Sequence, residues 1–227
     1  MNELLWGAML LINFSAILFS YRVWGKTGLY IWVPLAVMIA NIQVTKTIHL
    51  FGLTATLGNI VYATSFLVTD ILSENYGKKD AKKAVGIGFF ALIVMTVLMN
   101  LALYFMPDES DFAQSSLQTI FSIMPRIALG SLTAYGLSQL HDIWAYDMWK
   151  RRFAEDKYLW MRNNFSTMVS QLIDTVVFTL IAFSGVFPWP VLAQIMITTY
   201  LLKWVVALLD TPFLYLAKRW KSKGIIA

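Results

Sequence analysis

Long apolar stretches separated by short polar segments set the pattern of this chain. Windows of about 20 apolar residues, enough for a helix to cross a hydrocarbon core of about 30 Å, recur along all 227 residues. They predict seven spanning helices, at residues 4–21, 29–50, 54–72, 84–106, 117–146, 165–183 and 191–217. Gly52, Pro107 and Gly185 mark turns between windows. We therefore expect one all-α domain over residues 1–227, a polytopic transmembrane helix bundle of six to seven spans, in which Gly130 or Gly136 could break the fifth.

Composition supports a membrane protein and excludes several other classes. Hydrophobic residues make up 58% and charged residues 14% of the chain, against about 25% charged residues in soluble domains. The net charge of +5 does not indicate a nucleic-acid partner, because the basic residues lie in short loops without a recognition motif. With no cysteine and two histidines, we expect no metal site and no cofactor. No catalytic motif is present, which argues against an enzyme.

The positions of the basic residues predict the orientation in the membrane. The loops after spans one, three, five and seven carry 15 of the 18 Lys and Arg residues, whereas the intervening loops carry none. Because basic loops stay in the cytoplasm, the N-terminus is expected outside and the C-terminus inside a bacterial inner membrane. No cationic segment precedes the first window and no small-residue cleavage site follows it, so we interpret it as a retained span.

Charged residues inside the predicted spans are the first functional clue. The cations are Lys46, Arg126 and Lys203, and the anions are Asp70, Asp142, Asp174 and Asp210. Each costs at least about 2.5–3.5 kcal/mol at the centre of a spanning helix, so it normally faces protein or a water-filled cavity. Ion pairing that holds the bundle together is one interpretation, and a polar ligand site is the other. Lys203 and Asp210 lie about 10 Å apart along their helix, so each needs a partner elsewhere.

A short polar motif occurs twice. Residues 138–142 and 170–174 both have the sequence Ser-Gln-Leu-x-Asp, with the serine and aspartate one helical turn apart. Hydroxyl, amide and carboxylate groups on one face suit a small polar heterocycle, although interhelical hydrogen bonds would use the same groups. The echo also favours an internally duplicated transporter. We assign His49 and His141 to boundary or packing roles.

Residues 58–79 combine a polar helix face with a basic end. At 100° per residue, Asn59, Tyr62, Phe66 and Asp70 fall toward one side of a helix. The upper half is therefore a candidate binding surface. The lower half, which contains Glu74 and leads into the four lysines Lys78, Lys79, Lys82 and Lys83, is interpreted as an anchor or gate at the inner face.

Several of these segments together resemble a known family. They are residues 40–46 (ANIQVTK), 58–60 (GNI), 69–79 (TDILSENYGKK) and the later Ser170, Gln171, Asp174 and Phe178. This combination resembles the YhhQ-type queuosine precursor transporter family, which belongs with the bacterial vitamin uptake transporters and is similar to substrate-binding subunits of energy-coupling-factor systems. The resemblance implies import of 7-cyano-7-deazaguanine or 7-aminomethyl-7-deazaguanine, and it does not distinguish the two.

The implied ligand assigns roles to the polar and aromatic residues. A deazaguanine has an edge of N–H donors beside a carbonyl, which amides and carboxylates recognise, and two flat faces, which aromatic rings cover. The predicted substrate-binding residues are Asn41, Gln43, Asn59, Tyr62, Phe66, Gln171, Asp174 and Phe178, with Asp174 as the favoured acceptor. The predicted charge network or gate consists of Lys46, Asp70, Glu74, Arg126, Asp142, Lys203 and Asp210.

The mechanism expected from these residues is alternating access around a site at the membrane midplane. We expect an autonomous secondary transporter or a facilitator, and the intramembrane carboxylates leave proton coupling open. The alternatives are a binding subunit that needs a separate energy-coupling module, and a membrane scaffold with internally paired charges. The partners are the deazaguanine and the lipid bilayer, and homo-oligomerisation stays open.

Overall fold

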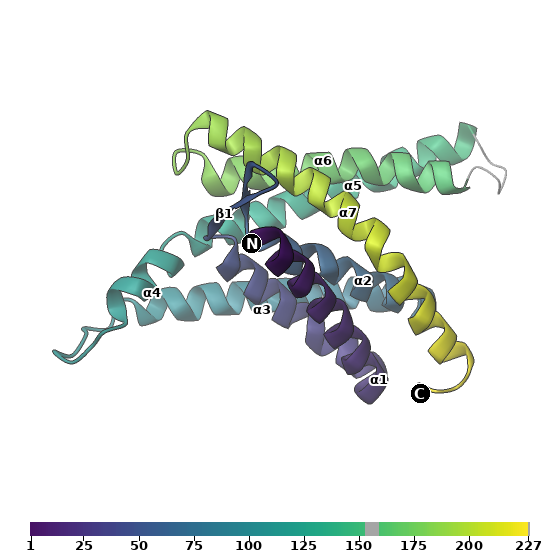
Figure 1. The fold of residues 1–227 in the computed structure, drawn as a ribbon, viewed down its shortest axis with the longest axis horizontal. Coiled ribbons are helices and arrows are strands. Elements are labelled where there is room, and N and C mark those ends of the chain that lie inside the picture. Colours follow the sequence, from purple (N-terminus) through teal and green to yellow (C-terminus); the bar gives the residue numbers. More distant parts are fainter. Residues whose placement is uncertain (153–158, 227) are drawn as a thin grey trace. The chain divides into compact units, whose positions relative to one another are not determined.

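A computed structural model describes residues 1–152 and 159–226 (Figure 1). The helices are α1 (Asn2–Gln43), α2 (Asn59–Tyr76), α3 (Lys78–Ala102), α4 (Gln114–Phe121), α5 (Met124–Arg152), α6 (Leu159–Phe183) and α7 (Trp189–Ser222). Strands β1 (Thr47–Leu50) and β2 (Leu53–Thr56) form one antiparallel hairpin. Two compact units contain residues 1–125 with 201–227 (unit 1) and residues 126–200 (unit 2).

The helical architecture is that of a membrane helix bundle. Four helices in the described part of the chain are long and apolar enough to cross a membrane, and residues 168–183 form a shorter apolar helix. The all-α class and the membrane location are therefore confirmed apart from the small hairpin. The number of spans and the direction of the termini stay predictions.

Helix α1 consists of two antiparallel halves that correspond to the first two predicted spans. At Gly25 the backbone has φ 55° and ψ −137°, a conformation that residues other than glycine rarely adopt. The halves then pass so closely that a Cβ atom on Gly28 would lie 2.2 Å from the Ser20 carbonyl oxygen. At the far end, Asn2 Nδ2 donates a hydrogen bond to the His49 carbonyl oxygen over 2.8 Å. The second half of α1 therefore runs back along the first, and the hairpin after it lies beside the N-terminus.

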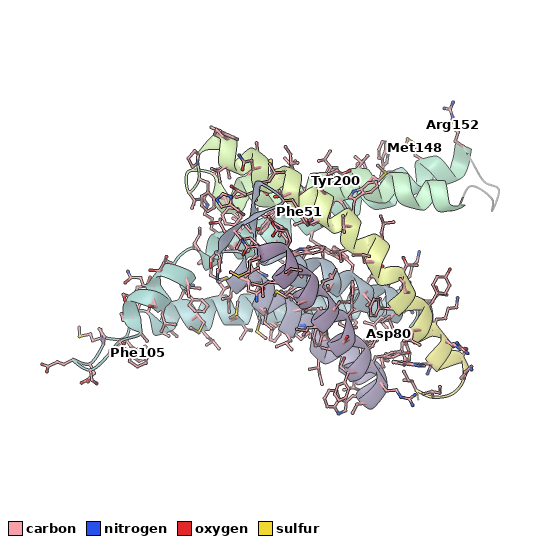
Figure 2. The ribbon with its side chains drawn as sticks, viewed as in Figure 1. Phe51, Asp80, Phe105, Met148, Arg152 and Tyr200 are labelled. Atoms are coloured by element: carbon pink, nitrogen blue, oxygen red, sulfur yellow. The ribbon has the colours of Figure 1, made fainter. Side chains whose placement is uncertain are left out.

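The β-hairpin replaces the expected ends of spans two and three. Span two was expected to continue to residue 50, but α1 ends at Gln43, and α2 begins at Asn59 rather than at residue 54. The turn at Gly52 is where the sequence predicts it: Phe51 has φ 50° and Gly52 has φ 79°, the two positive values of a type I′ turn. The left-handed Phe51 is held by its ring against Trp6, 6.4 Å between centroids, and by its N–H, which donates to Glu3 Oε1 over 3.2 Å (Figure 2).

A sharp turn at Gly77, with φ 97°, separates α2 from α3. Helix α3 therefore begins at Lys78, six residues before the apolar window, because its basic first turns are helical although they are not apolar. It ends at Ala102, before Pro107. A Cβ atom on Gly88 would lie 3.0 Å from Val33 Cγ1, so α3 approaches the second half of α1 closely.

The fifth predicted span is broken, but not where its glycines suggested. Helix α4 ends at Phe121 and α5 begins at Met124, so the break precedes Gly130 and Gly136. Gly130 instead lets α5 approach α6: an added Cβ atom would lie 3.4 Å from the Phe178 carbonyl oxygen. In unit 2, α6 ends at Phe183, and Gly185 (φ 77°) turns the chain into α7, as expected.

Basic groups from three parts of the chain gather at one end of unit 1. Lys26 Nζ lies 2.6 Å from Asp80 Oδ1, which links the Gly25 turn to the start of α3 (Figure 2 shows Asp80). Lys218, near the end of α7, pairs with Glu74 near the end of α2. Lys221 Nζ lies 4.8 Å from the Tyr76 ring centroid. This cationic end of unit 1 is what the predicted cytoplasmic loops require. Residues 153–158 of the third basic loop lie outside the described residues.

Candidate functional site

Two aromatic rings and a buried cation form the first set of candidate residues, in unit 1. Tyr62 and Phe66 lie one turn apart on α2, and their rings meet edge to face with 5.5 Å between centroids. Lys203 of α7 is only 7% exposed and places Nζ 5.5 Å from the Tyr62 ring centroid. A cation over an aromatic face is attracted by the ring quadrupole. The predicted stripe on α2 therefore faces α7.

Three of the predicted substrate-binding residues carry side-chain amides and lie next to the two ends of the hairpin. Asn41 and Asn59 are buried, and their Nδ2 atoms donate to the Val37 carbonyl oxygen (2.7 Å) and to Thr56 Oγ1 (3.0 Å). Gln43 has a buried side-chain carbonyl oxygen, Oε1, without a hydrogen-bond partner among the described residues. Asn59 is the first residue of α2, because the hairpin takes up the residues before it.

A glycine brings these amides together. A Cβ atom on Gly58 would lie 2.2 Å from the Ala40 carbonyl oxygen and 2.8 Å from the Val44 nitrogen. Both neighbours are backbone atoms, so no rotamer change could relieve the overlap. Gly58 therefore permits the start of α2 to lie directly against the last turn of α1, beside Asn41 and Gln43.

The second set of candidate residues lies on α6, in unit 2. Gln171, Asp174 and Phe178 are three and four residues apart and share one face of the helix. Asp174 is 7% exposed and interacts within the protein. The Gln171 side-chain carbonyl oxygen is buried and has no hydrogen-bond partner among the described residues. Gln171 is thus the member of this set whose acceptor is available to a ligand.

The two copies of the Ser-Gln-Leu-x-Asp motif lie on adjacent helices. His141 Nδ1 and Ser170 Oγ are 3.0 Å apart and join α5 to α6, and Ser138 and Ser170 are both buried. His141 therefore belongs to a polar contact, a role that the sequence reasoning missed by treating it as an isolated residue. The repeated motif, whose first copy contains His141, was the available signal. The side chain of Asp142 lies outside the described residues.

Two of the three predicted intramembrane cations have surroundings other than those expected. Lys46 follows the end of α1 and is exposed, because the hairpin interrupts the window that included it. Arg126 lies in the first turn of α5 and is exposed, with Nε donating to the Ile181 carbonyl oxygen over 2.8 Å and a second bond to that of Ser184. It satisfies carbonyl groups at the end of α6, where helical partners run out, instead of holding a carboxylate.

The remaining acidic candidates fall into two kinds. Glu74 is exposed and paired with Lys218, which fits an anchor at the cationic end. Asp210 is buried in α7, whereas Asp70 on α2 is exposed. In the described ranges no group of three or more metal-ligating His, Asp or Glu side chains occurs. The arrangement offers hydrogen-bond acceptors, aromatic faces and unpaired carboxylates.

Comparison with known proteins identifies the family. Residues 56–217 match the family model described as "Putative vitamin uptake transporter". A "Probable queuosine precursor transporter" of Bacillus subtilis is 47% identical over 96% of this chain and 95% of its own length. The "Queuosine precursor transporter" of Escherichia coli is 25% identical over 66% of this chain and 64% of its own. No solved structure matches. The chain is a multi-pass bacterial membrane protein and belongs to the YhhQ-type queuosine precursor transporter family of vitamin uptake transporters.

Proposed function

We propose that this protein imports queuosine precursors, 7-cyano-7-deazaguanine or its 7-aminomethyl relative, across the bacterial inner membrane. The proposal is supported by the names of its relatives and by one observation above the others. The side-chain carbonyl oxygens of Gln43 and Gln171 are buried without hydrogen-bond partners among the described residues. Leaving such an acceptor unsatisfied costs about 1–3 kcal/mol. A ligand that brings N–H donors would recover this energy.

The chemistry of a deazaguanine matches these groups. Its pyrimidine edge carries N–H donors, which suit the free carbonyl oxygen of Gln171 in unit 2. Aromatic faces that suit its flat ring are present in each unit, Phe178 in unit 2 and Tyr62 with Phe66 in unit 1. We favour Gln171 over Asp174 as the acceptor, because Asp174 already interacts within the protein. Phe178, one turn beyond Asp174, remains a candidate for stacking. Asn41 and Asn59 use their amide N–H groups inside the protein, which leaves positioning as their role.

The transport mode that we propose is autonomous. The inner membrane protein would work without an ATP-hydrolysing partner, as a secondary transporter or facilitator that opens alternately to each side. The competing reading is a binding subunit that needs an energy-coupling module. A scaffold with internally paired charges is disfavoured by Asp210, which has no ion pair in the described part of the chain.

Uptake of radiolabelled precursor into cells tests the mode of transport. The host should lack its own precursor transporter and every energy-coupling-factor component. We expect uptake to depend only on this protein. Uptake that appears only when an energy-coupling module is supplied would overturn the autonomous mode while leaving the substrate assignment standing. No uptake and no binding in either host would overturn the proposed function itself.

A further inference from the structure

Asp210 is a buried carboxyl group without a hydrogen bond or an ion pair among the described residues. It is 7% exposed in the middle of α7. The nearest cations on its own helix, Lys203 and Lys218, are about 10–12 Å away along the axis. Each is already engaged, Lys203 over the Tyr62 ring and Lys218 with Glu74. Nothing positive on α7 therefore neutralises Asp210.

A second carboxyl group, that of Asp70, faces this region from α2. Two contacts set how α2 and α7 lie along each other in unit 1, Tyr62 with Lys203 and Glu74 with Lys218. Residue numbers rise in the same direction through both contacts, so the helices are parallel. Asp70 lies between the two contacts on α2, and Asp210 lies between them on α7. Asp70 is eight residues beyond Tyr62, and Asp210 is seven residues beyond Lys203, so the two carboxyl groups lie at about the same level of the parallel helices.

Helix α1, which also packs against α7, supplies no cation at the level of the pair. Helix α1 packs on α7 through Phe14 and Phe213, with 4.6 Å between ring centroids. Between Glu3 and Arg22 it has no charged residue, and its one titratable group is Tyr21. Tyr21 accepts a hydrogen bond from Asn75 over 2.9 Å and faces the Tyr76 hydroxyl.

Three of the basic residues at the cationic end are engaged with other groups. Arg22 lies over the Trp220 ring, 5.5 Å from its centroid. At the start of α3, Asp80 is paired with Lys26, and Lys83 lies over Tyr30, 5.5 Å from the ring centroid. In the described part of unit 1, neither Asp70 nor Asp210 forms an ion pair or a hydrogen bond.

Asp210 is a buried carboxyl group with a second carboxyl group at its level on α2, so ionisation of both groups is unfavourable. Burying one isolated carboxylate is so costly that the group takes up a proton instead, and a like charge nearby increases that tendency. A metal cation would need more oxygen ligands than two side chains supply, and no metal-ligating group of three occurs in the described residues. Because Asp70 is exposed, water can deliver a proton to the pair.

We propose that Asp70 and Asp210 form a proton-binding site that couples import to the proton gradient. The proton binds as a carboxylic acid O–H shared by the pair, and it leaves to water on the other side when substrate is released. This inference rests on the proposed transport function. With one proton per neutral substrate, a gradient of one pH unit would support about tenfold accumulation.

Purified protein in liposomes tests the coupling. We expect deazaguanine to drive proton entry, reported by a trapped pH dye, and an inside-alkaline gradient to drive accumulation. In Asp210→Asn, exchange of labelled for unlabelled substrate should continue, whereas proton entry and accumulation above equilibrium should both disappear. Glu109→Gln, which changes an exposed loop carboxylate, is the matched control and should behave like wild type. Replacing sodium by choline should change nothing.

A readout that needs no substrate separates this inference from the proposed function. A hydrophobic carbodiimide reacts with protonated carboxyl groups, and mass spectrometry locates the adduct. We expect labelling at Asp210 or Asp70 at neutral pH and none at Glu109. The inference is overturned if neither aspartate is labelled, if wild-type uptake moves no protons, or if Asp210→Asn still accumulates substrate. Labelling without any deazaguanine uptake would instead contradict the proposed substrate and leave the proton site in place.

Discussion

Replacing Gln171 by leucine should weaken substrate binding and at the same time stabilise the empty protein. The side-chain carbonyl oxygen of Gln171 is buried without a partner among the described residues, so the empty state bears a penalty of about 1–3 kcal/mol. Leucine has a similar volume and no polar group, so this penalty disappears. The same energy is lost from the complex, in which a ligand N–H would have satisfied the oxygen. We expect binding to weaken by about 5- to 150-fold.

Two measurements on purified protein check the opposite signs. Thermal unfolding in detergent should show a melting temperature higher than wild type by about 2–4 °C per kcal/mol, and calorimetry should show the loss of affinity. Thr179→Val is the matched control on the same helix, because Thr179 Oγ1 is also buried without a described partner. It should raise the melting temperature and leave binding unchanged. A lower melting temperature in Gln171→Leu, with unchanged binding, would refute the reasoning.

Three further substitutions test the fold. Gly58→Ala should lower the free energy of unfolding by about 1–3 kcal/mol, because the added Cβ would overlap backbone atoms of α1. Gly86→Ala is the control and should not, because nothing lies within 4 Å of an added Cβ there. Equal melting temperatures of the two variants would contradict this reasoning. Arg126→Gln should cost about 1–2 kcal/mol in thermal unfolding through lost bonds to the end of α6, and an unchanged melting temperature would count against it. Glu74→Lys should lose about 0.2–1 kcal/mol, which the added change Lys218→Glu should restore if the pair is real.

The apolar windows predict most of the helices because the bilayer imposes the same length on every span. The turns at Gly52 and Gly185 were also predictable, because glycine is the residue that most readily adopts a positive φ value. Both glycines do so in the structure. The hairpin was not predictable from hydropathy. Its strands are four residues each, and half of their residues are apolar. Segments this short, next to a long apolar window, are equally consistent with the end of a helix. Missing it placed Lys46 inside a span, where it does not lie.

The sequence predicted the kinds of side chain in the candidate site better than it predicted their hydrogen-bond partners. Composition and spacing indicated amides, aromatics and acids on inward faces, but partners depend on helix packing that no single sequence encodes locally. Arg126 was expected to hold a carboxylate, and it bonds carbonyl oxygens at the end of α6. His141 was treated as isolated, and it contacts Ser170. Only the packed structure distinguishes the unsatisfied oxygen of Gln171 from the engaged group of Asp174.

The central claim is that this family member recognises a deazaguanine. The most direct measurement is competition: purified protein is loaded with labelled 7-cyano-7-deazaguanine and challenged with the aminomethyl relative, guanine or adenine. The account predicts displacement by the unlabelled precursor and its relative at far lower concentrations than by guanine, and none by adenine, which lacks the N–H and carbonyl pattern of the guanine edge. Binding of guanine with no binding of either precursor would contradict it.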